Sequence, residues 1–261
     1  MRLELDVLLK VQKQGNPPED YEDAIVWRRG SSECPDDDFP LRVAIADGAT
    51  EYSFSRLWAD LLAAEFVRKP FTTTEEMRKS ATRCARFWTR VVRKKPLPWY
   101  AEEKVKVGAY STLLGVQFLP PNTNGFGNWQ AVALGDSCLF QIGLEGIVMQ
   151  FPVTAYEDFG STPPLISTDP DYNSRSRGQL TYEEGVWTRD DLFLLMTDAL
   201  SQWATKEQPA RSFWDELLAT FLSDNGRILL RDWADRQRQS GIVRNDDITL
   251  AVVRIDEATS P

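Results

Sequence analysis

Hydrophobic and polar positions alternate along the chain with two different periods, and each period predicts a different kind of element. Leu3 to Leu9, Asp23 to Trp27 and Leu41 to Ala46 are short apolar runs bounded by polar or turn residues, which is typical of strands. Apolar residues recur at helical spacing from Phe54 to Phe66 and again from Thr74 to Val92. The first part of the chain therefore predicts strands followed by a pair of amphipathic helices.

The rest of the chain repeats this grouping of strands and helices. Consecutive strand-like segments joined by short turns, a predicted antiparallel meander, cover residues 107–118, 130–135, 138–142 and 147–151. The continuous apolar run from Leu192 to Thr197 predicts a buried strand, and Ile248 to Ile255 predicts a last one. Arg211 to Ser223 and Asn225 to Gln239 have the spacing of a second helix pair.

Grouped strands and paired helices favour antiparallel sheets over a parallel βαβ fold. We expect an α+β fold, a four-layer α-β-β-α sandwich with two central antiparallel sheets flanked by helix pairs. Because no long linker rich in Pro, Gly and Ser divides the chain, residues 1–261 are expected to form a single domain. Residues 151–184 combine many Pro, Ser, Asp and Gly residues with little periodicity, which predicts a surface excursion or a flap over a site.

Composition narrows the classes of partner. The 39 acidic and 30 basic residues give a net charge of -9, which argues against general binding to nucleic acid or to anionic membranes. No apolar run has membrane-spanning length, and the first ten residues do not have the pattern of a signal peptide. Cys34, Cys84 and Cys138 match no disulfide or thiolate-metal pattern, so we expect a cytoplasmic protein. The oligomeric state stays open.

The sequence contains no histidine. Catalysis by Ser-His-Asp or Cys-His groups, zinc sites with histidine ligands, and a histidine general base are therefore all excluded. Any enzymatic chemistry must rest on carboxylates, amines, hydroxyls, thiols or a bound metal.

Acidic residues stand where predicted strands begin or end. Those at strand starts are Glu22, Asp23, Asp246 and Asp247, and those after strand ends are Asp47 and Asp198. In an antiparallel sheet the start of one strand lies beside the end of its neighbour, so all of them can meet at one edge. Clustered carboxylates repel one another unless cations lie between them, and all-oxygen ligands favour hard ions such as Mg²⁺ or Mn²⁺. Two such ions can activate a bridging water without histidine.

A simpler interpretation stands beside this one. An acidic residue at a strand boundary is usually a turn former or a helix cap, and any one of these residues taken alone fits that role. Gly48 directly after Asp47 favours the metal-site interpretation slightly, because glycine permits a close approach of the backbone to an ion.

The order of these acids resembles that of the metal-dependent type 2C protein phosphatases. The segments that carry the resemblance are EDAIVW from Glu22, VAIADGA from Val43, ALGDSCLF from Ala133, LFLLMTDAL from Leu192 and NDDITLAVV from Asn245, with a weaker match in STLLG from Ser111. They extend from near residue 20 to the C-terminus in the order of the family, as in a divergent bacterial-type member. Each motif alone is weak, but the ordered set is specific.

The resemblance implies a role for each acid. Asp47 would bridge two divalent cations, and Asp198 and Asp246 would complete the first site as the other catalytic carboxylates. Glu22 and the carbonyl of Gly48 would serve the second site, mostly through ordered waters.

The resemblance gives three further acids more peripheral roles. Asp23 would orient its neighbour, and Asp247 is the alternative ligand if the alignment is shifted by one position. Asp136 matches the site of a third, weaker ion, and the polar tip of a hairpin turn is an equally good interpretation of that residue.

The chain also departs from the family pattern. Ala49 follows the Asp-Gly pair, so no side chain there can protonate the leaving oxygen. Ala199 replaces a frequent glycine, and Gln202 stands where a further aspartate would support a third ion. The arginine that often precedes the Glu-Asp pair is missing; Lys13, Arg28 or Arg29 are candidates to replace it at the phosphate, although a solvated surface charge is the commoner role for each.

The function implied by the resemblance is hydrolysis of phosphoserine and phosphothreonine in proteins by a water or hydroxide bridging two Mn²⁺ or Mg²⁺ ions. The substrate would be a phosphoprotein made by a Ser/Thr kinase. The departures favour an alternative, a binding or regulatory module with this fold and little or no catalysis. A hydrolase of small phosphate esters is a third possibility that the sequence does not separate from the first.

Overall fold

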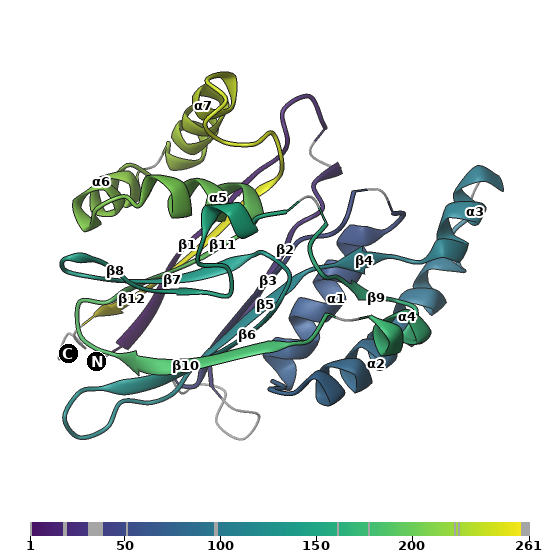
Figure 1. Cartoon of the computed structure of the whole chain (residues 1–261), viewed down its shortest axis with the longest axis horizontal. Coiled ribbons are helices and arrows are strands. Elements are labelled where there is room, and N and C mark those ends of the chain that lie inside the picture. The colour runs from purple at the N-terminus through teal and green to yellow at the C-terminus, as the bar shows by residue number, and fades with distance from the viewer. Residues whose placement is uncertain are drawn as a thin grey trace.

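Two antiparallel sheets lie at the centre of the molecule (Figure 1). The computed structural model describes residues 2–17, 20–30, 39–50, 52–96, 99–160, 162–176, 178–221, 223 and 225–256. Over these residues one five-stranded sheet has the order β1 (Arg2–Val11), β12 (Ile248–Asp256), β11 (Leu192–Met196), β7 (Cys138–Gly143) and β8 (Gly146–Phe151). The other has the order β10 (Thr181–Trp187), β6 (Gly127–Leu134), β5 (Leu113–Phe118), β3 (Leu41–Ala46) and β2 (Ala24–Arg28). We call them the first and the second sheet.

Helices lie on the outer sides of both sheets (Figure 1). Those on the side of the second sheet are α1 (Ser55–Arg68), α2 (Thr74–Val92), α3 (Trp99–Val107) and α4 (Pro170–Arg175). Those on the side of the first sheet are α5 (Asp198–Glu207), α6 (Arg211–Phe221) and α7 (Gly226–Gln239). A short 3₁₀ turn, η2 (Tyr156–Asp158), and the two-stranded ladder of β4 (Tyr110–Ser111) and β9 (Ile166–Ser167) complete the described elements. None of the described helices is both long and apolar enough to cross a membrane.

Three hydrophobic cores lie between the layers of the molecule. Strand β11 contributes to two of them. Leu192, Leu194 and Met196 pack toward α5 to α7, whereas Phe193 and Leu195 pack against the second sheet. Because both faces of this strand are buried, its sequence is continuously apolar instead of alternating. The third core lies between the second sheet and the helices α1 and α2. The α+β fold with two antiparallel sheets is therefore confirmed.

The predicted meander over residues 107–151 is only partly correct. Strands β5 and β6 pair in the second sheet, whereas β7 and β8 pair in the first, so the chain changes sheets between Leu134 and Cys138. Gly135 makes this crossing at φ 120°, and a Cβ there would lie 2.5 Å from the side chain of Thr112. The stretch before Tyr110, which the pattern assigned to a strand, ends helix α3 at Val107 instead.

Residues 152–180 carry the chain from β8 of the first sheet to β10 of the second. Within this segment β9 pairs with β4, and α4 packs against α2. Asn173 ties the segment together, because its side chain accepts a hydrogen bond from the N–H of Ser167 and donates one to the carbonyl of the same residue, both at 2.8 Å. The indole Nε1 of Trp58 donates to the carbonyl of Ile166 at 2.8 Å. The segment is thus fastened to the helical side of the second sheet.

Candidate active site

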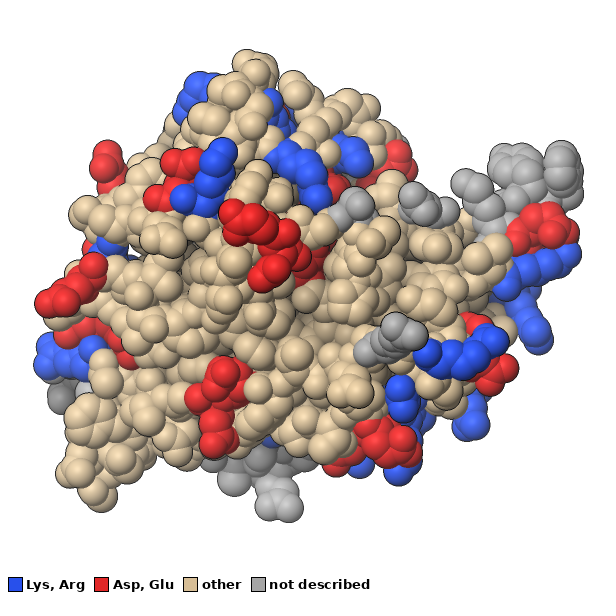
Figure 2. All heavy atoms as spheres, viewed as in Figure 1, with Lys and Arg blue, Asp and Glu red and all other residues tan. Residues whose placement is uncertain are grey.

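Acidic side chains from both sheets gather where their strands begin and end. Asp23 precedes β2, Asp47 follows β3, Asp198 begins α5 after β11, and Asp247 precedes β12. Strands β2 and β12, which belong to different sheets, contact each other, and Asp23 directly before β2 accepts a hydrogen bond from Thr249 of β12. We call the acids at these strand ends the acidic edge; its members are Glu22, Asp23, Asp47, Asp136, Asp198, Asp246 and Asp247. Figure 2 shows one face of the molecule, on which acidic and basic side chains lie side by side near the middle.

Asp23 joins the two sheets. Its Oδ2 accepts hydrogen bonds from the hydroxyls of Thr197 at 3.0 Å and Thr249 at 2.8 Å. These threonines lie at the end of β11 and the start of β12 in the first sheet. Its Oδ1 is buried and has no hydrogen-bond partner. Burial, followed by the charge of Asp247, raises the pKa of Asp23 well above the usual range of an aspartate. Asp23 therefore has one oxygen that holds the first sheet and one buried oxygen without a hydrogen-bond partner.

Backbone hydrogen bonds fix the position of Asp47. Its N–H donates to Oγ1 of Thr112 at 3.1 Å, and its carbonyl accepts from Oγ of Ser111 at 2.8 Å and from the N–H of Thr112 at 2.9 Å. Burial raises the pKa of Asp47 well above its usual range, and the neighbouring charges of Asp23, Asp246 and Asp136 raise it further. Acids from distant parts of the chain are thus close enough to repel one another electrostatically.

Gly48 and Glu22 lie next to Asp47. A Cβ at Gly48 would stand 2.9 Å from the carbonyl oxygen of Glu22 and 2.9 Å from the carbonyl carbon of Ser55, so the turn requires glycine for steric reasons. Burial raises the pKa of Glu22 to about 7 against the opposing hydrogen bond from Thr50. This carboxyl is therefore partly protonated at neutral pH unless a cation binds near it.

Asp246 and Asp247 face different partners. Both oxygens of Asp247 accept backbone hydrogen bonds, Oδ1 from the N–H of Lys13 at 2.7 Å and Oδ2 from the N–H of Glu22 at 2.8 Å. Asp246 instead forms ion pairs, with Nζ of Lys13 at 3.9 Å and with the guanidinium of Arg244 at 3.5 Å. The side chain of Asp247 thus connects the backbone at Lys13 to that at Glu22, whereas the side chain of Asp246 faces the positive charges of Lys13 and Arg244.

Asp136 lies at the crossing between the sheets. It is 4% exposed, and neither of its carboxylate oxygens has a hydrogen-bond partner. Burial raises its pKa, whereas the charge of Arg244 lowers it. The interpretation of this residue as the polar tip of a hairpin turn is therefore wrong, because β6 and β7 on either side of it belong to different sheets.

Two of the basic residues expected at the phosphate occupy different places. Lys13 borders the acidic edge through its ion pair with Asp246. Arg28 pairs with Arg42 at the far end of the β2–β3 ladder, whereas Ala24 pairs with Ala46 beside Asp47. The structure thus brings Lys13 to the acidic edge and leaves Arg28 about 13 Å along the strand from Ala24 at the usual rise per residue.

Sequence reasoning missed three polar residues of the edge. Arg244 forms ion pairs with Asp198 and with Asp246, and Thr197 and Thr249 hold Asp23. The threonines carried a signal, since each is a polar residue in or directly after an apolar strand. Arg244 carried a weaker one: it stands just before the Asp246 motif, but nothing local shows which way its side chain points.

The donor chemistry of the acidic edge fits hard divalent cations. Within the described part of the chain, no three acidic side chains are close enough to form a ready metal-binding set. Three buried carboxylate oxygens nevertheless lack any hydrogen-bond partner, one on Asp23 and two on Asp136. Unpaired buried carboxylate oxygens are costly, and cations that prefer oxygen ligands would satisfy them.

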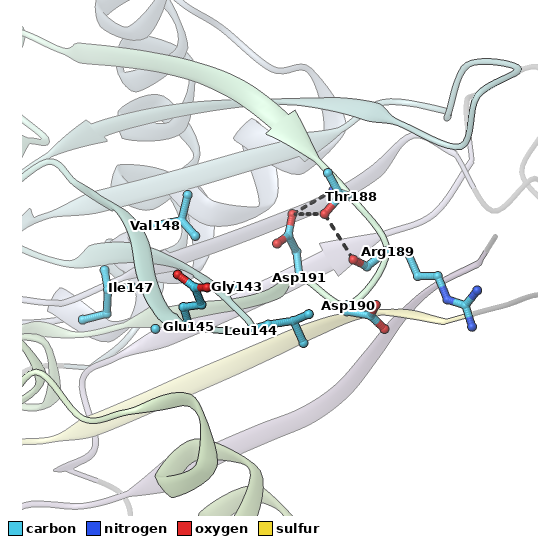
Figure 3. A pocket seen from close by; sticks show the side chains of 10 residues that line it. Gly143, Leu144, Glu145, Ile147, Val148, Thr188, Arg189, Asp190 and Asp191 are labelled. Carbon is cyan, nitrogen blue, oxygen red and sulfur yellow. Dashed lines mark hydrogen bonds between the residues drawn. The ribbon is translucent and has the colours of Figure 1, made fainter.

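Two pockets differ in their relation to the acidic edge. One of about 550 Å³ begins at Glu22 and continues between the polar loop before β2 and the start of α1, where Phe54 and Lys95 line it. Another of about 580 Å³ is lined by Gly143 to Val148 and Thr188 to Asp191 (Figure 3). The second pocket lies at the opposite ends of β7 and β11 from Asp136 and Asp198, so it does not belong to the acidic edge.

Comparisons with solved structures identify the fold. The serine/threonine phosphatase Stp1 from Staphylococcus aureus matches with a TM-score of 0.60 at 12% identity, covering 98% of each chain. The S. agalactiae serine/threonine phosphatase matches with a TM-score of 0.53 at 14% identity, covering 97% of this chain and 100% of that one. The catalytic domain of the serine/threonine protein phosphatase PstP, solved with two manganese ions, matches with a TM-score of 0.55 at 14% identity, covering 97% of this chain and 99% of that one.

At these identities the likeness shows a shared fold. No protein-family model matches the sequence, and no curated protein matches it. The fold is thus that of solved serine/threonine phosphatases, and the activity has to be argued from the residues of the acidic edge.

Proposed function

We propose that this protein hydrolyses phosphoserine and phosphothreonine in proteins, using two Mn²⁺ or Mg²⁺ ions held by the acidic edge. The observation that carries the proposal is that strand-end carboxylates from two sheets lie within electrostatic reach of one another, beside buried oxygens of Asp23 and Asp136 that have no hydrogen-bond partner. Further support comes from the fold, which resembles solved serine/threonine phosphatases over nearly the whole chain.

Each acid has a distinct part in the proposal. Asp47 would contact both ions, Asp198 and Asp246 would hold the first, and Glu22 with the carbonyl of Gly48 would hold the second. The ions would supply the positive charge that polarises the phosphoryl group and acidifies the attacking water.

The remaining acids would position the others or bind more weakly. Asp23 would restrain the neighbouring Asp47, since it is itself held by Thr197 and Thr249. Asp247 would fix the loops of Lys13 and Glu22 through its hydrogen bonds to their N–H groups. Asp136 would be a ligand of a weaker third ion.

Lys13 and the pocket beside Glu22 would receive the substrate. The ammonium of Lys13, 3.9 Å from Asp246, is close enough to the edge to meet a phosphoryl oxygen. The adjoining pocket of about 550 Å³ gives room for residues that flank a phosphorylated hydroxyl. A phosphoprotein made by a Ser/Thr kinase therefore suits this site better than a small ester, which would leave the pocket unused.

A second candidate function is a binding or regulatory module with little catalysis. It is favoured by the ion pairs of Arg244 with Asp198 and Asp246, because these supply a cation from the chain itself. The departures at Ala49, Ala199 and Gln202 favour it as well.

The test is hydrolysis of p-nitrophenyl phosphate and of a phosphothreonine peptide with Mn²⁺, with Mg²⁺ and with EDTA. We expect activity only with the ions, and a loss of at least about 100-fold in Asp47→Asn and Asp198→Asn because each variant removes a charge on which the transition state depends. Asp215→Asn is the matched control, since Asp215 pairs with Arg211 on the exposed side of α6.

The outcomes separate the candidate functions. Wild-type protein no faster than Asp47→Asn at saturating Mn²⁺ would favour the binding module. Cleavage of the small ester without the peptide would favour a small-molecule hydrolase. Undiminished activity in EDTA would contradict the role of the ions.

A further inference from the structure

Arg244 contributes a positive charge to the acidic edge from within the chain. Its guanidinium forms an ion pair with Oδ2 of Asp198 and lies 3.5 Å from Oδ2 of Asp246. It also lowers the pKa of Asp136 through its charge. A planar guanidinium can bridge two carboxylates, and a single cation placed between them relieves their repulsion.

The backbone at Arg244 is held firmly on both sides. Val243 before it is buried in the core under α5 to α7, and the N–H of Asp246 donates to the carbonyl of Arg244 at 3.0 Å. The carbonyl of Asp246 in turn accepts a hydrogen bond from Arg238 at 2.6 Å. The Arg244 side chain, by contrast, is 40% exposed. The backbone of Arg244 is thus fixed beside the acids, while its side chain is partly exposed to solvent.

The oxygens that Arg244 engages are those that a divalent cation would need. Oδ1 of Asp198 accepts the N–H of Ala199 at 2.5 Å, which leaves Oδ2 as the outward oxygen, and Arg244 contacts that atom. A guanidinium and a divalent ion cannot both occupy the space between Asp198 and Asp246, because they exclude each other sterically and repel each other electrostatically.

We propose that Arg244 is a built-in counter-cation of Asp198 and Asp246, and that a divalent ion enters this part of the acidic edge by displacing it. Arg244 thereby lowers the affinity for the ion and stabilises the protein while the ion is absent. This inference rests on the proposed function, because it requires that the acidic edge binds divalent ions.

The first test measures Mn²⁺ binding by isothermal titration calorimetry on chelator-treated full-length protein. The variants are Arg244→Gln and Arg244→Met, which remove the charge, and Arg244→Lys, which keeps it. Arg83→Gln is the control, because it removes an equal charge at the distant ion pair with Glu65. We expect the dissociation constant to fall about tenfold or more in the two uncharged variants, to stay near the wild-type value in Arg244→Lys, and to remain unchanged in Arg83→Gln.

The second test compares thermal unfolding with and without Mn²⁺. In EDTA, Arg244→Gln is expected to unfold at a lower temperature than the wild type, since the acids have lost their counter-cation. At saturating Mn²⁺ the difference should disappear. A variant destabilised equally under both conditions would show that Arg244 has only a structural role, which would overturn the proposal.

A third test uses the wild-type protein, so it does not depend on the folding of any variant. Phenylglyoxal modifies accessible arginines, and peptide mass spectrometry reports the rate at each site. Addition of Mn²⁺ should accelerate modification of Arg244 several-fold and leave the rate at Arg83 unchanged. An equal rate at Arg244 with and without the ion would mean that the ion does not displace it.

The failures of the two proposals can be told apart. Equal Mn²⁺ affinity in the wild type and Arg244→Gln would overturn the role of Arg244 and leave the proposed metal site standing. No binding heat with either protein would overturn both.

Discussion

At the scale of single residues, the acidic edge depends on groups whose neighbours come from distant parts of the chain. Asp23 is held by hydroxyls more than 170 residues further along. Gly48 is confined between the backbone of Glu22 and that of Ser55. Such contacts couple the position of each acid to the packing of both sheets, so small changes in volume here should disturb the entire group.

Replacing Gly48 by alanine tests this confinement. The added Cβ would lie 2.9 Å from backbone atoms on two sides, and backbone cannot rotate away as a side chain can. We expect Gly48→Ala to lower the free energy of unfolding by about 1–3 kcal/mol, the usual cost of overpacking. Urea denaturation measures it.

The control for this substitution is Gly160→Ala. Among the described residues beyond its two chain neighbours, a Cβ at Gly160 would come no closer than 3.9 Å to another atom, an ordinary van der Waals contact. Its stability should match the wild type within about 0.5 kcal/mol. Equal stability of both variants would mean that the turn after Asp47 relaxes freely, contrary to the steric argument.

At the scale of elements, local signals explain which helices were predictable. Helix α2 has buried residues at helical spacing along one face, and Thr73 caps it by accepting a hydrogen bond from the N–H of Glu76 at 3.3 Å. Helices α3, α4 and α5 were missed. Helix α5 begins at Asp198, which the sequence pattern indicated only as the acid after an apolar strand. Its buried residues lie all round the helix instead of along one stripe, so no helical period is visible in its sequence.

The cap of α2 gives a prediction at this scale. Thr73→Ala removes the acceptor for the N–H of Glu76 and should lower the free energy of unfolding by about 1 kcal/mol. Thr73→Ser should restore it, because serine caps equally well. The midpoint of thermal unfolding reports both.

The neighbouring Thr72→Ala serves as the control. Thr72 is exposed and takes part in the cap through its backbone N–H, which donates to Glu76 at 3.1 Å and survives the substitution. If Thr72→Ala lowered the free energy of unfolding as much as Thr73→Ala, helix propensity near the terminus, and not the cap, would account for the loss of stability.

At the scale of the whole molecule, the core between the sheets holds the two halves of the acidic edge in register. Phe193 of the first sheet packs edge-on against Phe118 and Trp129 of the second, with ring centroids 4.9 and 6.3 Å apart. Asp47 belongs to one sheet and Asp198 to the other, so this core sets the distance between them.

Phe193→Ala tests the core between the sheets. Removing a fully buried ring should cost about 3–5 kcal/mol of stability, measured by urea denaturation. Leu144→Ala is the control, because Leu144 is 73% exposed at the β7–β8 turn and should change stability by less than about 0.5 kcal/mol. Similar values for the two variants would contradict the role assigned to this core.

The sequence by itself determined where most elements lie and which chemistry is open to the site. Runs such as Leu41 to Ala46 and Thr74 to Val92 match the elements observed, because periodicity depends on residues only a few positions apart. The lack of histidine and the acids at strand ends limited the chemistry in the same local way.

Only the tertiary structure decided how distant residues pair. In the structure, β6 and β7 belong to different sheets, and the chain crosses between them at Gly135. Both oxygens of Asp247 accept hydrogen bonds from backbone N–H groups, and Arg244 forms an ion pair with Asp198. These outcomes join parts of the chain that no local pattern relates. They depend on how the two sheets pack on each other through a shared core, and residues from widely separated parts of the chain make up that core.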